Sequence, residues 1–292
     1  MYFNTSNIFI RGNSLYTIVD GPKWTESETN ANKLGGHLVT INDAQENQWL
    51  HDNNLHGWIG FTDKEVEGDW RWISGEEATF VSWTSWDPDN IGNEDYAAKS
   101  SLQWGDANNI GTGNGGPNLK GVVETKFIRR SNSAYVIVEG PTWEEAEANA
   151  NKLGGHLVTI NDAEENAWLF NKFNIVGIDG GDDAYWSGYK NFSESPSNEG
   201  NWQWTSGEES NYTNWAEGEP NGPNGGEVAV LGRFGDSGLW NDAVNFHNSS
   251  GPSPSFGISE SNFIRRGDSA YVLVEGPTWE EAEANANKLG GH

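Results

Sequence analysis

The chain repeats itself, and this repeat limits its fold more than any other feature of the sequence. The segment GPKWTESETNANKLGGHLVTINDAQENQWL begins at Gly21 and returns as GPTWEEAEANANKLGGHLVTINDAEENAWL at Gly140. It begins a third time at Gly276 and runs as far as His292. Self-similarity at a long period indicates that a whole structural unit has been copied. A chain of 292 residues is long enough for about two domains, one for each full copy.

Each copy opens with signals for a strand and then a helix. Tyr135–Glu139 is rich in β-branched residues and predicts a strand. Thr142 and Glu145 have the spacing of a capping box at the start of a helix. Four apolar residues then fall on one helical face: Trp143, Ala146, Ala150 and Leu153. Asp162, with Glu165 three residues on, predicts the start of a second helix. Two helices among short strands and long Gly-rich loops predict an α+β fold.

The composition argues against several classes of function. A formal net charge of -26 argues against nucleic acid or an anionic membrane surface as the partner, since both attract basic proteins. The chain has no Cys, which excludes disulfides, thiol catalysis and thiolate metal sites. No stretch is apolar enough for a membrane helix, and no ordinary signal peptide is visible at the N-terminus. The charge suits a protein that binds cations.

One loop gathers many oxygen-bearing side chains. The stretch from Asn211 to Asp242 is rich in Gly, Pro and Asn. A loop that long inside a compact domain is usually functional. Hard cations such as Ca²⁺ bind carboxylate and amide oxygens. We therefore expect a calcium site here, built from Glu219, Asn221, Glu227, Asn241 and Asp242.

The order of motifs in this loop resembles the calcium and sugar site of C-type lectin domains. Trp215 is followed by EPN at residues 219–221, then by Glu227, then by WND at residues 240–242. The segments HLVTINDAEENAWL, GWIGFTD and GNWQWTSGEE also resemble that family. The resemblance implies tandem C-type lectin-like domains with two helices, small mixed sheets and a long calcium-binding loop. It also implies that Pro220 is cis.

The resemblance covers nearly all of both full copies. We expect one domain over residues 8–126, a second over 127–262, and a truncated third copy over 263–292, as in a fragment of a longer array. The closing strand of each unit should pair with its opening strand, as in the family. Animal members of the family usually carry disulfides, so a cysteine-free chain resembles the bacterial type of repeat.

In the second unit the resemblance implies direct coordination of a sugar by the bound ion. Two adjacent hydroxyls would replace waters on Ca²⁺, and the EPN triplet goes with mannose-, glucose- or fucose-type sugars. Four of the ion's ligands would also hydrogen-bond the sugar: Glu219, Asn221, Glu227 and Asn241. Binding of a single sugar should be weak, because the contact is small and wet.

The first unit departs from this pattern. Its triplet is DPD at residues 87–89, and its last motif is WGD at residues 104–106, so Gly105 offers no side-chain oxygen. A second candidate calcium set remains: Asp87, Asp89, Glu94 and Asp106. Trp86 stands beside the triplet, and we favour a packed side chain over an exposed platform for a sugar ring.

The first unit also has residues that resemble the auxiliary calcium site of the family. They are Asp63, Glu67 and Asp95, with Glu94 beside them. In the second unit we expect Val228 to take the place of Asp95. The first unit would then bind calcium mainly for structure, while the second binds the ligand.

Some residues suggest catalysis and are better explained otherwise. The repeated His37, His156 and His292 have no second His or Cys at metal-ligand spacing, so we expect structural roles. The Glu76-Glu77 and Glu208-Glu209 pairs follow Ser-Gly turns and are expected to be solvated. No catalytic motif is visible, and we expect no enzyme activity.

These features predict a calcium-dependent carbohydrate-binding protein for adhesion or recognition. The sugar site would lie in the second unit, and the protein would act outside the cell or at its surface. The alternative is a calcium-stabilised protein-binding or structural adhesin module that binds no sugar. Many proteins of one fold bind different partners, so the fold alone does not decide between them.

Overall fold

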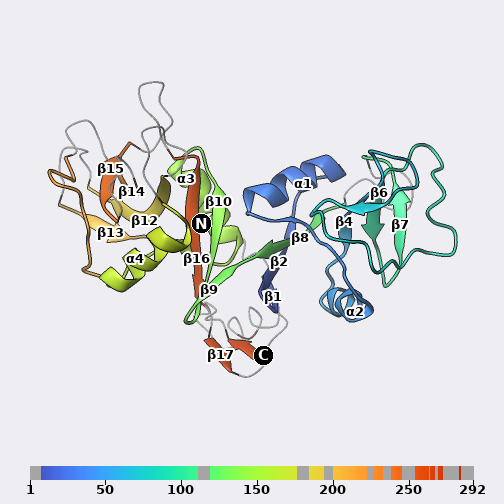
Figure 1. The fold of residues 1–292 in the computed structure, drawn as a ribbon, viewed down its shortest axis with the longest axis horizontal. Helices are drawn as coiled ribbons and strands as arrows, with labels where there is room; N and C mark the ends of the chain where they lie inside the picture. Colours follow the sequence, from blue (N-terminus) through green and yellow to red (C-terminus); the bar gives the residue numbers. More distant parts are fainter. Residues whose placement is uncertain are drawn as a thin grey trace. The chain divides into compact units, whose positions relative to one another are not determined.

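The computed structural model describes residues 8–110, 119–175, 184–193, 200–221, 227–232, 238–244, 254–262, 264–266, 269–271 and 283. The chain divides into two compact units, with the boundary between Phe127 and Ile128. Each unit contains one full copy of the repeat. Within the described ranges, each unit has two helices and one sheet of eight strands (Figure 1).

In the first unit the sheet has the order β1-β2-β8-β4-β6-β7, with β3 paired to β8 and β5 paired to β4. The closing strand β8 therefore lies in the middle of the sheet. The elements are β1 (Phe9–Arg11), β2 (Ser14–Val19), α1 (Trp24–Lys33), β3 (His37–Leu38), α2 (Ala44–Asp52), β4 (Gly57–Thr62), β5 (Arg71–Trp72), β6 (Tyr96–Lys99), β7 (Trp104–Ala107) and β8 (Gly121–Lys126).

The second unit repeats this arrangement element by element. Its sheet has the order β15-β14-β12-β16-β10-β9, with β11 paired to β16 and β13 paired to β12. Its elements are β9 (Ile128–Arg130), β10 (Ser133–Glu139), α3 (Trp143–Lys152), β11 (His156–Leu157), α4 (Ala163–Lys172), β12 (Tyr185–Asn191), β13 (Trp202–Trp204), β14 (Val228–Leu231), β15 (Trp240–Ala243) and β16 (Phe256–Asn262).

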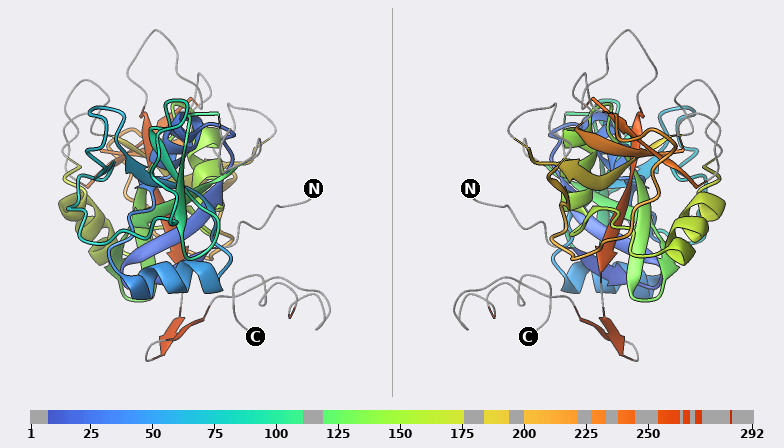
Figure 2. Two further views of the ribbon diagram at one scale, coloured as in Figure 1. Left: turned by 90° about the vertical axis from the view of Figure 1, so that its right-hand side faces the viewer. Right: turned by 90° about the vertical axis from the view of Figure 1, so that its left-hand side faces the viewer.

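The opening and closing strands of each unit are antiparallel neighbours, as predicted (Figures 1 and 2). In the second unit the pairing runs from Ser133 opposite Asn262 to Glu139 opposite Phe256. In the first it runs from Ser14 opposite Lys126 to Val19 opposite Gly121. This pairing brings the two ends of each unit together.

The helices begin where the sequence predicts. The Thr142 hydroxyl accepts a hydrogen bond from the Glu145 N–H at 3.3 Å, and the Asp162 carboxylate accepts one from the Glu165 N–H at 2.8 Å. These bonds satisfy N–H groups that have no partner inside the helix. The four residues expected on one helical face are all buried: Trp143, Ala146, Ala150 and Leu153.

Tryptophan side chains fill much of each core. Trp240 is fully buried and donates from its ring nitrogen to Asn166 Oδ1 at 2.7 Å. Trp104 is its counterpart in the first unit and donates to Asn47 Oδ1 at 3.1 Å. Buried rings of this size contribute large apolar areas, while the hydrogen bond satisfies their one polar group. Because the chain has no cysteine, this packing holds each core together without a disulfide.

A buried tyrosine joins two carboxylates in each unit. The Tyr135 hydroxyl lies 2.7 Å from Glu165 Oε1 and 3.0 Å from Glu260 Oε1. In the first unit the Tyr16 hydroxyl likewise lies 2.8 Å from Glu46 Oε1 and 3.2 Å from Glu124 Oε1. Burial, with the neighbouring carboxylates, raises the pKa of Glu260 to about 7. The network ties the opening strand, the second helix and the closing strand together.

Replacing Tyr135 by Phe should destabilise the second unit by about 1–3 kcal/mol, because two buried carboxylates lose their shared donor. Chemical denaturation of the full chain measures this change. Tyr212→Phe is the matched control, since its half-buried hydroxyl lies outside the network, and it should change stability by well under about 1 kcal/mol. Equal effects of the two substitutions would contradict the role given to the network.

The third copy starts like the first two. Strands β17 (Ile264–Arg266) and β18 (Ser269–Tyr271) form a two-stranded sheet, which matches the hairpins β1-β2 and β9-β10. The helix expected after it lies outside the described residues, apart from Glu283. None of the helices in the described ranges has the length and apolar character needed to cross a membrane.

Candidate calcium and ligand site

In the second unit, the EPN triplet and the WND motif meet at one end of the sheet. The peptide bond between Glu219 and Pro220 is cis, as predicted. The Asn221 N–H donates to Asp242 Oδ1 at 3.0 Å, and the Asn221 amide donates to Glu219 Oε1 at 2.7 Å. Trp215 forms a bridge to Trp240, which positions the loop beside β15. Three of the five predicted ligands are therefore in contact.

Two buried oxygens of the EPN and WND motifs have no hydrogen-bond partner among the residues described. Within the described part of the chain, the buried Glu219 Oε2 and Asn241 Oδ1 accept no hydrogen bond. Asn241 is 5% exposed and Asp242 is 8% exposed. Burial and the neighbouring Asp242 carboxylate raise the pKa of Glu219 to about 7. Buried oxygens that lack partners are costly in an apo protein, and a hard cation would satisfy them. The residues present therefore fit a calcium ion.

Glu227 lies just before β14, next to residues 222–226, which are outside the described set. Its N–H donates to the Ala243 carbonyl at 2.9 Å, and its own carbonyl accepts from the Asn191 N–H at 2.8 Å. These backbone bonds hold Glu227 near the end of β15. Its carboxylate as an ion ligand stays a prediction.

The first unit has a matching cluster. The Asp87–Pro88 bond is also cis. Oxygens of Asp87, Asp89 and Asp106 all lie within 4.8 Å of one another. Asp106 is fully buried, and its Oδ2 accepts from the Asp89 N–H at 2.9 Å. Its Oδ1 is buried without a hydrogen-bond partner among the residues described. This donor set also fits a divalent cation.

Glu94, the fourth predicted ligand, is 8% exposed. Burial and the charges of Asp106 and Asp89 raise its pKa to about 7. Asn90 was not singled out from the sequence, yet it links the cluster. Its N–H donates to Asp106 Oδ2 at 3.0 Å, and its side-chain oxygen accepts from the Glu94 N–H at 3.0 Å. The available sequence signal was an Asn directly after the triplet, a residue type that tolerates the left-handed region, where Asn90 lies at φ 53°.

The strand registers align the two sites and correct one expectation. Gly105 lies opposite Ala98, and Asn241 lies opposite Val230, so Gly105 does take the place of Asn241. In the same registers Tyr96 pairs with Ala107, and Val228 pairs with Ala243. Val228 therefore corresponds to Tyr96.

It follows that Glu227 corresponds to Asp95, and the expectation that Val228 replaces Asp95 is wrong. Backbone bonds agree, because the Asp95 carbonyl accepts from the Asp63 N–H, just as the Glu227 carbonyl accepts from the Asn191 N–H. Glu94 and Glu227 are both glutamates, which suggested matching them, but Glu227 follows Asn221 at the same spacing as Asp95 follows Asp89.

The residues proposed for an auxiliary site lie near one another in the first unit. Asp63 is 3% exposed, its Oδ2 accepts from the Gly68 N–H at 2.8 Å, and its buried Oδ1 has no partner among the described residues. Loss of water and the Asp63 carboxylate raise the pKa of Glu67. The Asp95 carboxylate accepts from the Asn93 amide at 2.8 Å. Asp63 and Glu67 could share a cation here.

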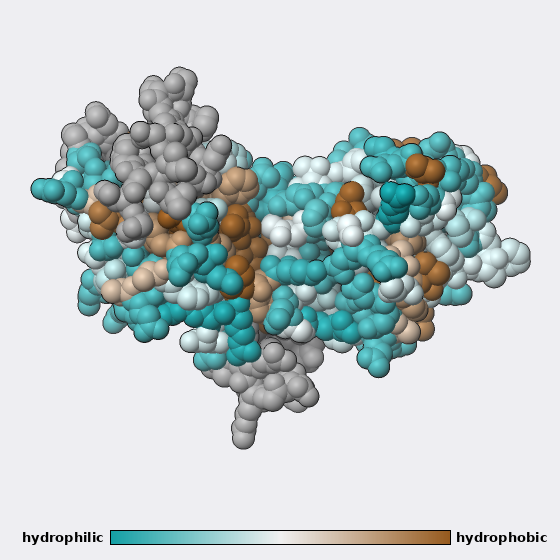
Figure 3. Space-filling view, in the orientation of Figure 1, coloured by the Kyte–Doolittle hydropathy of each residue, from teal (hydrophilic) through white to brown (hydrophobic). Residues whose placement is uncertain are grey.

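Trp86 is exposed, contrary to the packed side chain that we favoured. It is 82% exposed, and Ile91 in the same loop is 74% exposed. Figure 3 shows isolated brown patches of hydrophobic residues among the mostly hydrophilic surface of the chain. In the same loop it is Trp83 that packs inward, with 6.0 Å between its ring centroid and that of the buried Trp104.

The histidines of the repeat have the structural role expected for them. His37 Nδ1 lies 2.6 Å from Glu28 Oε1, and His156 Nδ1 lies 2.8 Å from Glu147 Oε1. These hydrogen bonds to carboxylates raise the pKa of both imidazoles. His292 lies outside the described residues.

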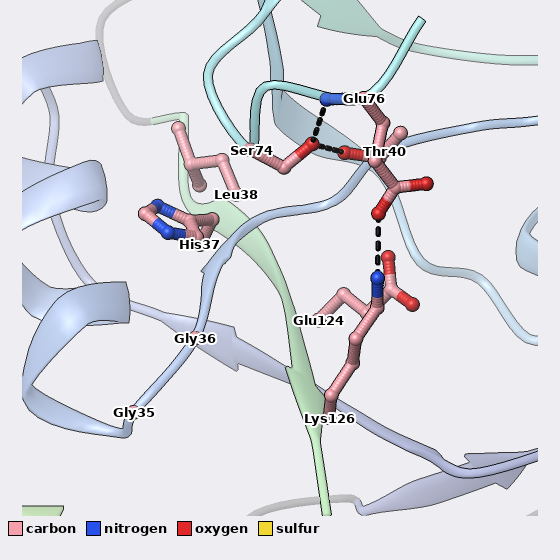
Figure 4. Close-up of a pocket in the computed structure, with 9 residues that line it drawn as sticks. All are labelled: Gly35, Gly36, His37, Leu38, Thr40, Ser74, Glu76, Glu124 and Lys126. Atoms are coloured by element: carbon pink, nitrogen blue, oxygen red, sulfur yellow. Dashed lines mark hydrogen bonds and ion pairs between the residues drawn. The ribbon is translucent and has the colours of Figure 1, made fainter.

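A polar pocket of about 250 Å3 lies beside His37, away from the carboxylate clusters (Figure 4). The Lys126 amine points toward the Glu76 carboxylate at 2.7 Å, and this contact lowers the pKa of Glu76. Thr40 and Ser74 are hydrogen-bonded at 2.7 Å. Because its polar groups pair with each other, the pocket offers a ligand little to bind.

The comparisons with known proteins point to one family. The model of the family described as Lectin C-type domain matches residues 21–111 and 139–247. The Perlucin-like protein of Mytilus galloprovincialis is 33% identical over 98 residues, which are 30% of this chain and 63% of that protein. The C-type lectin domain family 4 member M of Hylobates lar is 32% identical over 105 residues, which are 34% of this chain and 26% of that protein.

These matches span less than two thirds of the length of either relative. Among solved structures, the mouse scavenger receptor C-type lectin carbohydrate-recognition domain has 23% identity and a TM-score of 0.38, over 42% of this chain and 97% of that chain. The family model matches more than half of this chain and falls in both units. The protein therefore belongs to the family that carries the Lectin C-type domain.

Proposed function

We propose that the second unit binds carbohydrate through a calcium ion held at the meeting point of the EPN and WND motifs. The observation that carries this proposal is that the EPN and WND motifs, joined by the Asn221–Asp242 hydrogen bond, hold two buried oxygens without a partner among the described residues, Glu219 Oε2 and Asn241 Oδ1. One of the relatives is a C-type lectin by name, and carbohydrate recognition is the function that such a site supports best.

Some residues of this site would hold the ion, and others would bind the sugar. Glu219, Asn241 and Asp242 would hold the ion, and the Asn221 N–H keeps the Asp242 carboxylate in place at 3.0 Å. The amides of Asn221 and Asn241 would donate to sugar hydroxyls, while Glu219 and Glu227 would accept from them. Calcium supplies a charge that draws hydroxyl oxygens into its shell. Hydroxyl pairs of the mannose, glucose and fucose type suit this pattern of donors and acceptors.

We also propose that the two domains span residues 8–126 and 127–262. The protein would act outside the cell or at its surface. Calcium in the millimolar range outside cells would fill a weak site made only of oxygen ligands. Several units on one chain would raise the overall affinity for a glycan-bearing surface, although each contact is weak.

The test is retention of the full chain on a mannose-bearing resin with calcium and then with a chelator. We expect retention in calcium and release by the chelator. A galactose-bearing resin is the control for sugar type and should retain much less protein. Retention that persists in chelator, or that is equal on both resins, would contradict the proposal. Calcium that raises the melting temperature without any retention would leave a calcium-stabilised scaffold.

A further inference from the structure

We propose that the first unit carries a separate binding surface for a basic protein segment, formed by the exposed indole of Trp86 beside the carboxylates of Asp87 and Asp89. Lysine or arginine side chains of the partner would be the groups recognised. This inference does not depend on sugar binding by the second unit, although it uses the same end of the fold.

The first observation is the charge of the cluster. Four carboxylates converge there, whereas one divalent cation neutralises only two charges. The second unit has amides where the first has Asp89 and Gly105, so its site carries less negative charge. With calcium bound, the first site therefore keeps a surplus of negative charge. Charge complementarity favours a cationic partner and opposes an anionic one.

The second observation is that the cluster is built around a buried group. Asp106 is fully buried, and its Oδ1 has no hydrogen-bond partner within the described ranges. A cation at that depth would be held mainly by Asp106 and Glu94, the two buried members. Asp89 is exposed and Asp87 is half-buried, so both can also face a partner.

The third observation is the position of Trp86. Trp86 is 82% exposed, and its backbone N–H donates to the Thr84 hydroxyl at 3.3 Å. The same hydroxyl donates to Asp87 Oδ2 at 2.6 Å. Thr84 thus ties the backbone of the exposed indole to a carboxylate of the cluster. The face of an indole ring attracts ammonium and guanidinium groups.

The second unit lacks this surface. By alignment from Trp83 and Trp215, Gly218 stands where the first unit has Trp86, and Ala216 stands where it has Thr84. Gly218 has a φ of 86°, a conformation that favours glycine, and a Cβ placed there would meet no described atom within 4 Å. Of these two loops, in the parts that the structure describes, only the loop of the first unit has an exposed indole at this position.

A sugar fits the first site less well. A hydroxyl that gives one lone pair to the ion and its proton to a carboxylate still needs a donor for its other lone pair. The second unit provides such donors through its amides. The first has a carboxylate at Asp89 and no side chain at Gly105. A guanidinium or ammonium group only donates, which matches a surface made of acceptors.

The experiment measures binding of a fluorescein-labelled arginine hexapeptide amide to the full chain in calcium, by fluorescence anisotropy. Trp86→Ala should weaken binding about fivefold, the range of a partly exposed cation–π contact. Trp86→Phe keeps an aromatic face and should weaken it less. Because Trp86 is exposed, neither substitution should disturb folding. Both variants should keep the mannose-resin retention of the parent chain, so failure of one proposal is distinguishable from failure of the other.

Two controls address unspecific attraction to an acidic protein. Glu77→Gln removes one exposed negative charge elsewhere in the first unit and should leave peptide binding nearly unchanged, whereas Asp89→Asn should weaken it. Equal losses in these two variants, with none in Trp86→Ala, would overturn the proposal. So would retention of the full chain on a sugar resin that Trp86→Ala abolishes, since that would make the indole part of a sugar site.

Discussion

Replacing Asn241 by Gly should lower binding to a mannose-bearing resin by at least about tenfold. The substitution removes both an ion ligand and a hydrogen-bond donor, and each such loss costs about 1–3 kcal/mol in a buried site. Gly105 already occupies the equivalent place in β7, so the backbone of β15 tolerates glycine. Retention in calcium, measured on the full chain, is the readout.

Asn241→Asp separates the two roles of this side chain. It keeps an oxygen for calcium and removes the amide that would donate to a sugar hydroxyl. We expect calcium to raise the melting temperature of this variant as it does for the parent chain, while sugar retention is lost. Unchanged sugar retention in both variants would show that Asn241 does not contact the ligand.

Replacing Lys99 by Leu should stabilise the first unit by about 2–3 kcal/mol at neutral pH, since a pKa unit corresponds to about 1.4 kcal/mol. Lys99 is 1% exposed, and burial lowers its pKa from 10.5 to about 8. Its amine contacts the Ser101 carbonyl. The register places Lys99 opposite Trp104, just as Leu231 lies opposite Trp240. The second unit thus already has a leucine at this place.

The pH dependence has a definite sign. Between about 8 and 10.5 the unfolded chain holds a proton on Lys99 that the folded chain has lost, so stability should rise with pH in this window. Lys99→Leu should lose that rise. Calorimetry across this pH range measures both effects. The reciprocal Leu231→Lys should destabilise the second unit, and a neutral outcome there would contradict the cost assigned to burying the amine.

Local signals predicted the elements that depend on neighbours in the chain. Thr142 and Asp162 cap helices because a side chain and an N–H three residues on are always close in that geometry. Helical spacing alone placed Ala146 and Ala150 on the buried face. The prediction of a cis bond at Pro220 came from the motif resemblance, and the structure confirms it.

Positions set by distant parts of the chain were harder to predict. Trp86 was expected to pack, yet it is 82% exposed, whereas Trp83 in the same loop packs against Trp104 from a later strand. The role of Asn90 depends on Asp106, which folds back beside it from a later strand.

The sequence by itself determined the repeat, the two units, the helices and the residue types of the candidate calcium sites. These follow from patterns that are local or that recur along the chain. Only the tertiary structure decided that Trp86 faces solvent, and that Asp106 and Asn241 hold buried oxygens without partners among the described residues. Register and burial are set by which segments meet in space, and no single segment of the sequence carries that information.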